Sequence, residues 1–144
     1  MLHLIARQSG ATFAIDAGRI IEILPWIDLN EPIGESERVS GLLTYRGRVL
    51  PTVDLGPLVG KAPSKDLLSA RILVVDDPRV RSGTARHALL VQALGDMTRL
   101  DAEMIAIATK EAVKPPKGQR FLGPVVPYGD EPVRILYPER VLDY

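Results

Sequence analysis

The chain has 144 residues, which is enough for one domain with its own hydrophobic core. It contains no cysteine, which excludes disulfide bonds, thiolate nucleophiles and cysteine-based zinc sites. Its 18 basic and 18 acidic residues balance, so the sequence shows none of the basic excess that nucleic-acid-binding proteins usually carry.

The N-terminal residues carry no basic leader, and their apolar run is too short for a signal peptide. No window of about 18 residues is free of charged side chains, so we expect no segment that spans a bilayer. The absence of cysteine fits a reducing cytoplasm. These features predict a cytoplasmic protein without direct membrane insertion.

Short apolar runs rich in Val, Ile and Leu dominate the chain, and Gly, Pro and Asp bound them. Such runs, spaced by about ten residues, are typical of the strands of barrels and sandwiches. Because proline lacks the N–H of a central ladder, Pro51 and Pro124 predict edge or bulged strands. Residues 82–86 predict a hairpin loop, and 138–142 a closing helical turn. The predicted strands are residues 2–6, 12–16, 19–24, 39–45, 48–55, 71–75, 87–94, 121–128 and 132–137.

The segment from Leu100 to Val113 is open to two interpretations. Its summed propensity favours a helix that Asp101 caps and Pro115 follows. The apolar run from Met104 to Thr109 is also compatible with a strand. We favour a strand start followed by a loop.

Few residues offer catalytic or metal-binding chemistry. His3 and His87 each lie within an apolar run without a partner at zinc-ligand spacing, which predicts structural roles. Asp76 and Asp77 end an apolar strand, where functional carboxylates are often found, but Pro78 follows at once and favours a turn. We therefore predict no enzyme activity, no catalytic residue, no metal and no cofactor.

Two charged residues, Glu22 and Arg46, lie within apolar runs, and charged side chains are rarely buried unless they are paired. Aromatic side chains interleaved with cations, as single-strand nucleic-acid grooves require, occur only at Tyr45-Arg46 with Arg48. We therefore predict no nucleic-acid partner. Trp26 suits either a core or an interface, because it combines a large apolar area with one polar donor.

The stretch from Val39 to Leu55 reads VSGLLTYRGRVLPTVDL, and it resembles the signature of CheW-like domains. That signature is a Gly-Val-x-Asn-Leu-Arg-Gly segment, then two or three residues, then Pro-Val-Val/Ile-Asp-Leu. Thr44 and Tyr45 depart from it, since the family usually has Asn and Leu there. Residues 13–16 and 20–23 are similar to the family's opening. The matching positions are Gly41, Arg46, Gly47, Val49, Pro51, Val53, Asp54 and Leu55.

The resemblance implies a single CheW-like domain over residues 1–144, mainly β, with two packed five-stranded β-barrel subdomains and few short helical turns. One barrel is expected mainly in residues 11–68 and the other mainly in 70–144, with exchange of strands between them allowed. The nine or ten strands predicted from the sequence suit this architecture.

The resemblance also implies a function. CheW-like proteins are non-enzymatic adaptors that couple the cytoplasmic tips of methyl-accepting chemoreceptors to the regulatory domain of a CheA-type histidine kinase. We therefore expect a cytoplasmic protein located at membrane-associated receptor arrays. The Tyr-Arg-Gly variant at 45–47 and the Phe-Leu-Gly-Pro segment at 121–124 suggest an alternative, surface-sensing chemosensory system.

The implied receptor groove supplies the candidate site. In the family, the acid and the arginine that match Glu22 and Arg46 lie close together beside it, so we predict an ion pair; the alternative is that both side chains simply point to water. Apolar candidates for the groove are Ile20, Ile23, Val39, Leu43 and Val49, with core packing as the competing role for each. Architectural roles are predicted for Gly41, Gly47, Pro51 and Asp54, with Gly47 in a turn and Asp54 as a helix cap.

A function of another class stays open. The same barrels could bind a small ligand or nucleic acid, or Asp76 and Asp77 could serve an enzyme. Those functions require a concave pocket with convergent polar groups and shifted pKa values.

Overall fold

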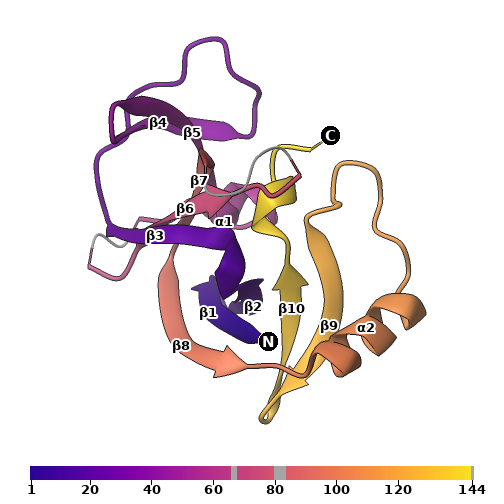
Figure 1. The fold of residues 1–144 in the computed structure, drawn as a ribbon. Helices are drawn as coiled ribbons and strands as arrows, with labels where there is room; N and C mark the ends of the chain where they lie inside the picture. Colours follow the sequence, from indigo (N-terminus) through magenta and orange to yellow (C-terminus); the bar gives the residue numbers. More distant parts are fainter. Residues whose placement is uncertain (66–67, 80–83, 144) are drawn as a thin grey trace.

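The computed structural model describes residues 1–65, 68–79 and 84–143 (Figure 1). The first sheet has the order β8-β1-β2-β10-β9, from β1 (Leu2–Gln8), β2 (Ala11–Asp16), β8 (Ala93–Arg99), β9 (Leu122–Tyr128) and β10 (Glu131–Leu136). The second has the order β3-β6-β7-β5-β4, from β3 (Ile20–Pro25), β4 (Val39–Tyr45), β5 (Arg48–Asp54), β6 (Arg71–Asp76) and β7 (Ala85–Val91). The short helical elements are η1 (Ala17–Arg19), α1 (Leu55–Leu58), α2 (Ala102–Glu111) and η2 (Pro138–Arg140).

Two five-stranded sheets with few helices confirm the predicted mainly β class, but the sheets are not closed barrels. In the part of the chain that the structure describes, the end strands β8 and β9 do not pair, and neither do β3 and β4. The opening of the second sheet is crossed by a single bridge, in which Asn30 and Leu42 exchange backbone hydrogen bonds of 2.9 and 2.8 Å. Of the loop predicted at 82–86, residues 82 and 83 lie outside the described residues.

Each sheet combines strands from distant parts of the chain. The first joins N-terminal β1 and β2 to C-terminal β8, β9 and β10, with β2 and β10 parallel. The second takes the strands between them, and its one parallel pair is β5 with β7. The expected division at about residue 69 is therefore not the division between the sheets.

The largest core cluster lies between the sheets and contains residues of both, such as Leu4 and Phe13 from the first and Leu73 and Leu89 from the second. A second cluster lies within the curl of the second sheet, and a third lies between the first sheet and α2. Because one continuous apolar cluster joins the sheets, each depends on the other for burial.

The contested segment forms the helix α2, so the strand that we favoured there is wrong. The Asp101 carboxylate caps the helix by accepting a hydrogen bond of 2.9 Å from the Glu103 N–H. Met104, Ile105 and Ala108 pack against the third cluster, and this spacing places them on one face of a helix. Packing against the first sheet therefore adds to the helical propensity of the segment.

The prolines of the strands behave differently from each other. Pro124 lies on the end strand β9, as predicted. Pro51 lies on β5, which is an interior strand without a bulge at that position, so its prediction is wrong. Leu42, which faces Pro51, directs its N–H and C=O to Asn30, and the ladder to β7 begins only at Thr52. The missing N–H of Pro51 therefore removes no ladder hydrogen bond.

Candidate partner-binding site

The hairpin between β4 and β5 presents Arg46 at its tip. Arg46 and Gly47 form a two-residue turn closed by the pair of Tyr45 and Arg48, and their φ angles are +48° and +77°. Two consecutive residues with positive φ are typical of a type I′ turn, whose twist matches that of the strands. The predicted turn role of Gly47 is thus confirmed, since glycine adopts this conformation without strain.

The predicted ion pair between Glu22 and Arg46 is present. Arg46 Nη2 lies 3.0 Å from Glu22 Oε1, and the Tyr45 hydroxyl donates to the same oxygen at 2.6 Å. The Arg46 guanidinium also lies over the Tyr45 ring, 5.3 Å from its centre. Since Glu22 is on β3 and Tyr45 on β4, these contacts join the two end strands of the curled second sheet; we call this place the β3–β4 seam.

Tyr45 was not predicted as a member of this cluster, because it counted only as a departure from the family signature. The signal for it was its spacing of two from Leu43, which puts both side chains on the inner face of β4. The pKa of the Tyr45 hydroxyl is raised above its ordinary value, chiefly because the hydroxyl donates to the Glu22 carboxylate. Tyr45 thus orients the carboxylate that Arg46 neutralises.

Exposed apolar side chains lie on β3 and on β5. Ile23 on β3 is 40% exposed, and Val49 on β5, directly after the tip of the hairpin, is 61% exposed. Ile21 of β3 is exposed as well, because exposed and partly buried residues alternate along this strand. Sequence analysis missed Ile21, although its spacing of two from Ile23 puts both side chains on one face of the strand.

The other apolar candidates belong to the core. Val39 and Leu43 are 7% and 1% exposed, so neither can contact a partner directly. Ile20 is half-buried and packs against the cluster between the sheets. Of the five apolar candidates, the structure therefore exposes only Ile23, on the strand of Glu22, and Val49, on the hairpin that carries Arg46.

Gly41 allows the close approach that spans the second sheet. A Cβ atom on this residue would lie 2.6 Å from Leu29 Cβ and 3.2 Å from the Asn30 carbonyl oxygen. Any side chain at Gly41 would therefore displace the segment that carries the Asn30–Leu42 bridge.

Asp54 caps α1, as predicted, and also joins the sheets. Its carboxylate accepts hydrogen bonds from the Gly56 N–H at 3.0 Å and from the Ser64 N–H at 2.9 Å and hydroxyl at 2.8 Å. Gln8 of β1, fully buried, donates to the Ser64 hydroxyl at 3.0 Å. The cap thus completes a buried polar chain from the second sheet to the first.

The histidines and the acidic pair make structural contacts. His87 Nε2 donates to the Pro138 carbonyl at 2.8 Å, and burial lowers the pKa of the ring. Asp77 accepts from the Arg79 N–H at 3.0 Å, as in the predicted turn, and the Arg79 guanidinium lowers the pKa of this carboxyl. Among the described residues, no group of three His, Asp or Glu side chains could hold a metal ion.

The described helices include none that is long and apolar enough to cross a membrane. Fold and site together define a two-sheet β domain whose surface carries a paired charge among exposed apolar side chains. The sequence model of the family described as the CheW-like domain matches residues 3–144, and the chain belongs to this family.

A solved structure with the same fold is the scaffolding protein TtCheW from Thermoanaerobacter tengcongensis. The match has a TM-score of 0.79 and 15% sequence identity, and it covers 99% of this chain and 92% of that one. A search of curated proteins found no significant match.

Proposed function

We propose that this protein is a non-enzymatic adaptor that couples the cytoplasmic tips of membrane chemoreceptors to a CheA-type histidine kinase, and that the β3–β4 seam binds the receptor. The observation that carries this proposal is the exposure of Ile21 and Ile23 on the strand of Glu22 and of Val49 on the hairpin of Arg46, with Glu22 and Arg46 themselves paired. Membership of the CheW-like family and the fold shared with a scaffolding protein support it.

The chemistry of the seam suits a helical partner. A receptor helix would present an apolar stripe, and exposed Ile and Val side chains are complementary to it. Arg46 would contribute a directional contact, because its side chain is mostly exposed and is held by Glu22 and Tyr45. This function places the protein in the cytoplasm at membrane-associated receptor arrays.

Tyr45 stands where the family usually has Leu, and it contacts both members of the charge pair. It therefore changes the surface that a receptor would contact, compared with the usual family sequence. We therefore propose that the partners belong to an alternative, surface-sensing chemosensory system. The output can be tested by deleting the protein. A change in surface-dependent second-messenger synthesis would support a surface-sensing system, whereas a change in swimming alone would indicate a system that controls motility.

The test is binding to a purified chemoreceptor cytoplasmic fragment and to a CheA-type kinase of the same organism. We expect Arg46→Ala and Ile23→Asp to weaken receptor binding by roughly ten-fold or more, because truncation at an interface centre typically has this effect. Arg7→Ala is the matched control, since Arg7 also forms an ion pair at the surface, with Glu131 on the first sheet. Ile107→Asp on α2 controls for the loss of an exposed isoleucine.

The double substitution Glu22→Arg, Arg46→Glu tests the pairing itself. It should bind receptor better than either single substitution, because it restores an opposite-charge pair. Absence of receptor binding by the unaltered protein would contradict the adaptor role, and binding of a metabolite or nucleic acid instead would favour a ligand-binding barrel.

A further inference from the structure

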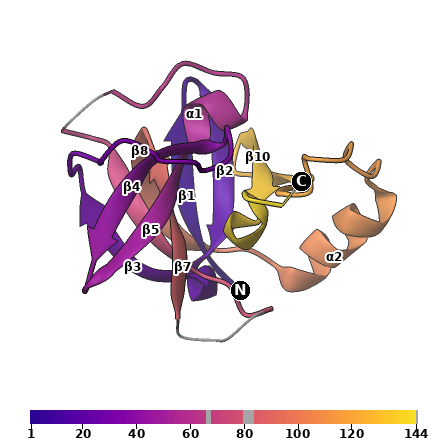
Figure 2. The same ribbon diagram turned by 90° about the horizontal axis from the view of Figure 1, so that it is seen from above.

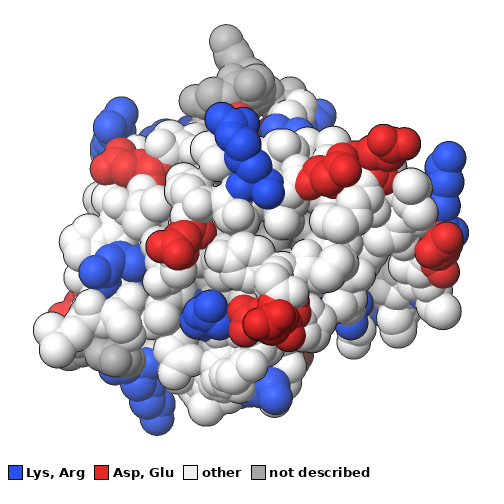
Figure 3. Space-filling view, turned by 90° about the horizontal axis from the view of Figure 1, so that it is seen from below, with Lys and Arg blue, Asp and Glu red and all other residues white. Residues whose placement is uncertain are grey.

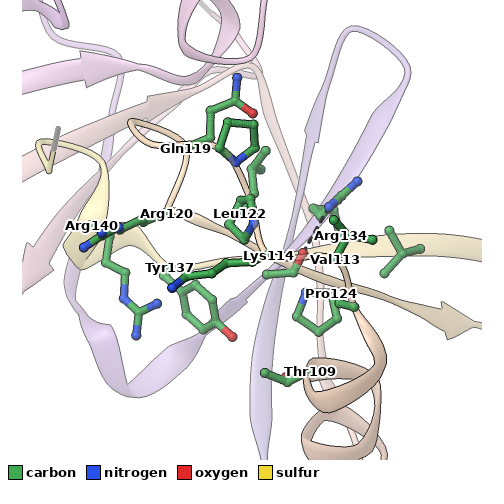
Figure 4. A pocket seen from close by; sticks show the side chains of 15 residues that line it. Thr109, Val113, Lys114, Gln119, Arg120, Leu122, Pro124, Arg134, Tyr137 and Arg140 are labelled. Carbon is green, nitrogen blue, oxygen red and sulfur yellow. Dashed lines mark hydrogen bonds between the residues drawn. The ribbon is translucent and has the colours of Figure 1, made fainter.

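A groove of about 790 Å³ lies at the other side of the molecule, between the C-terminal end of α2, residues 112–120, β9 and η2 (Figure 4). Figures 1 and 2 both place α2 far from the hairpin of β4 and β5. The groove is therefore separate from the β3–β4 seam, and its volume lies in the range of natural ligand sites.

Four cationic side chains line the groove, namely Lys114, Arg120, Arg134 and Arg140, and none of its described lining residues is acidic. Figure 4 shows Arg120 and Arg140 on one side and Arg134 on the other. None of the four forms an ion pair with a described residue. The face in Figure 3, by contrast, intersperses acidic and basic side chains. Although the charges of the whole chain balance, the groove thus concentrates positive charge.

The floor of the groove is apolar. Val113 is 94% exposed and Val125 about half exposed, and Leu122 and Tyr137 lie between the cations. The Arg140 guanidinium lies over the Tyr137 ring, 4.3 Å from its centre, so the cation and the aromatic face form one surface. A ligand that fills this groove therefore needs carboxylates or other anions together with apolar groups.

Phosphate-rich ligands fit this groove poorly. Phosphate sites are usually built from backbone N–H groups and helix N-termini, whereas α2 directs its C-terminal end here. Pro115, Pro116 and Pro124 also remove N–H donors from the lining. For the same reason a peptide cannot extend the sheet along β9, which contains Pro124 and Pro127. Recognition must come from side chains, and because arginine forks bind carboxylates and phosphates alike, the apolar part of the lining favours a peptide over a phosphate-rich ligand.

We propose that this groove is a docking site for an acidic peptide segment of a partner protein, whose carboxylates pair with the four cations while its apolar side chains cover Val113, Leu122 and Val125. The site does not depend on the proposed receptor coupling. Because it lies away from the seam, both sites can be occupied at once, which would allow one molecule to hold two partners.

The experiment measures fluorescence anisotropy of a short labelled peptide of Glu and Leu residues against the full chain. A peptide with Lys in place of Glu is the matched probe. We expect the acidic peptide alone to bind, with affinity that falls as salt rises from about 50 to about 300 mM, since counterions screen exposed charges. Arg120→Glu should weaken binding roughly ten-fold or more, because it replaces a charge-assisted contact by a repulsive one.

Arg99→Glu is the control variant, because Arg99 is exposed on β8, at the opposite end of the first sheet, and the change in net charge is the same. It should leave affinity within about two-fold. Val113→Ser tests the apolar floor and should weaken binding roughly five-fold, without loss of the fold at so exposed a residue. Thermal melts of each variant confirm folding.

Equal binding of the basic peptide, no binding of the acidic one, or an unchanged affinity of Arg120→Glu would overturn the proposal. Displacement of the peptide by tripolyphosphate or an oligonucleotide at lower concentration than free peptide would assign the groove to a phosphate ligand instead. Loss of receptor binding at the seam, with peptide binding intact, would affect only the proposed function.

Discussion

The two sheets manage their open ends in different ways. The end strands β3 and β4 of the second sheet are joined across the opening by Glu22, Tyr45 and Arg46 and by the Asn30–Leu42 bridge, so charge is paired and apolar residues are exposed around it. The end strand β9 of the first sheet has α2 beside it instead, and unpaired cations gather in the groove. Protecting a sheet edge thus also determines the chemistry of the surface beside it.

The largest expected effect is on the free energy of unfolding, and it differs between a glycine at the β3–β4 seam and a glycine in the groove beside β9. Gly41→Ala should lower the free energy of unfolding by about 2–3 kcal/mol, because the new Cβ meets Leu29 Cβ and the backbone of Asn30, which cannot move independently. Gly123→Ala should lower it by about 1 kcal/mol, since its Cβ would meet Ile135 Cβ and the flexible Tyr137 ring. Urea denaturation measures both, and an equal loss would show that the seam is no more rigid than the groove.

A pH experiment asks whether the two sheets unfold together. His87 of β7 binds the Pro138 carbonyl beyond β10, and its lowered pKa means that the folded state favours the neutral ring. Stability is therefore complete above the ordinary histidine pKa of about 6.5 and falls as the pH drops below it, because the unfolded state takes up the proton more readily. The charged groups that face the ring are Asp77, Arg79 and Asp143.

We expect urea unfolding followed by Trp26 fluorescence, which reports on the second cluster, to coincide with unfolding followed by far-UV circular dichroism both at about pH 7 and at about pH 5, since one core cluster joins the sheets. His87→Gln should remove the part of the pH dependence due to the ring. Separate transitions would show that the sheets are independent units.

The exposed ion pairs of the two sheets should contribute little and equally to stability. Arg46→Ala and Arg7→Ala should each change the free energy of unfolding by less than about 1 kcal/mol, because solvent screens pairs of this exposure. Chemical denaturation at low and high salt measures this. If Arg46→Ala were clearly more destabilising, a loss of receptor binding in that variant would reflect the fold rather than the contact.

The smallest effect is spectroscopic and concerns the seam alone. Tyr45 should ionise at higher pH than an exposed tyrosine, because its hydroxyl donates to Glu22. Ultraviolet titration of the protein and of Glu22→Gln measures this, and one tyrosine should titrate at lower pH in the variant.

Features that depend on neighbouring residues could be predicted from the sequence. The Arg46-Gly47 turn follows from the glycine and the flanking apolar runs, and the Asp54 and Asp101 caps follow from their positions before helical segments. The Glu22–Arg46 pair needed the family resemblance as well, since 24 residues separate its members.

Features that depend on long-range packing could not be predicted from the sequence. The spacing of Met104, Ile105 and Ala108 was compatible with two structures until the first sheet supplied a surface for one of them. The burial of Leu43 is likewise decided by the curl of the second sheet.

The sequence by itself therefore determined most of the strands of this protein, though not β8, and its turns and caps, and with the resemblance its family. Tertiary structure alone decided which strands share a sheet, how its edges are protected, and how Lys114, Arg120, Arg134 and Arg140 come to line one groove. The physical reason is that local sequence fixes backbone conformation over a few residues, whereas burial and charge clustering depend on segments that only the folded chain brings together.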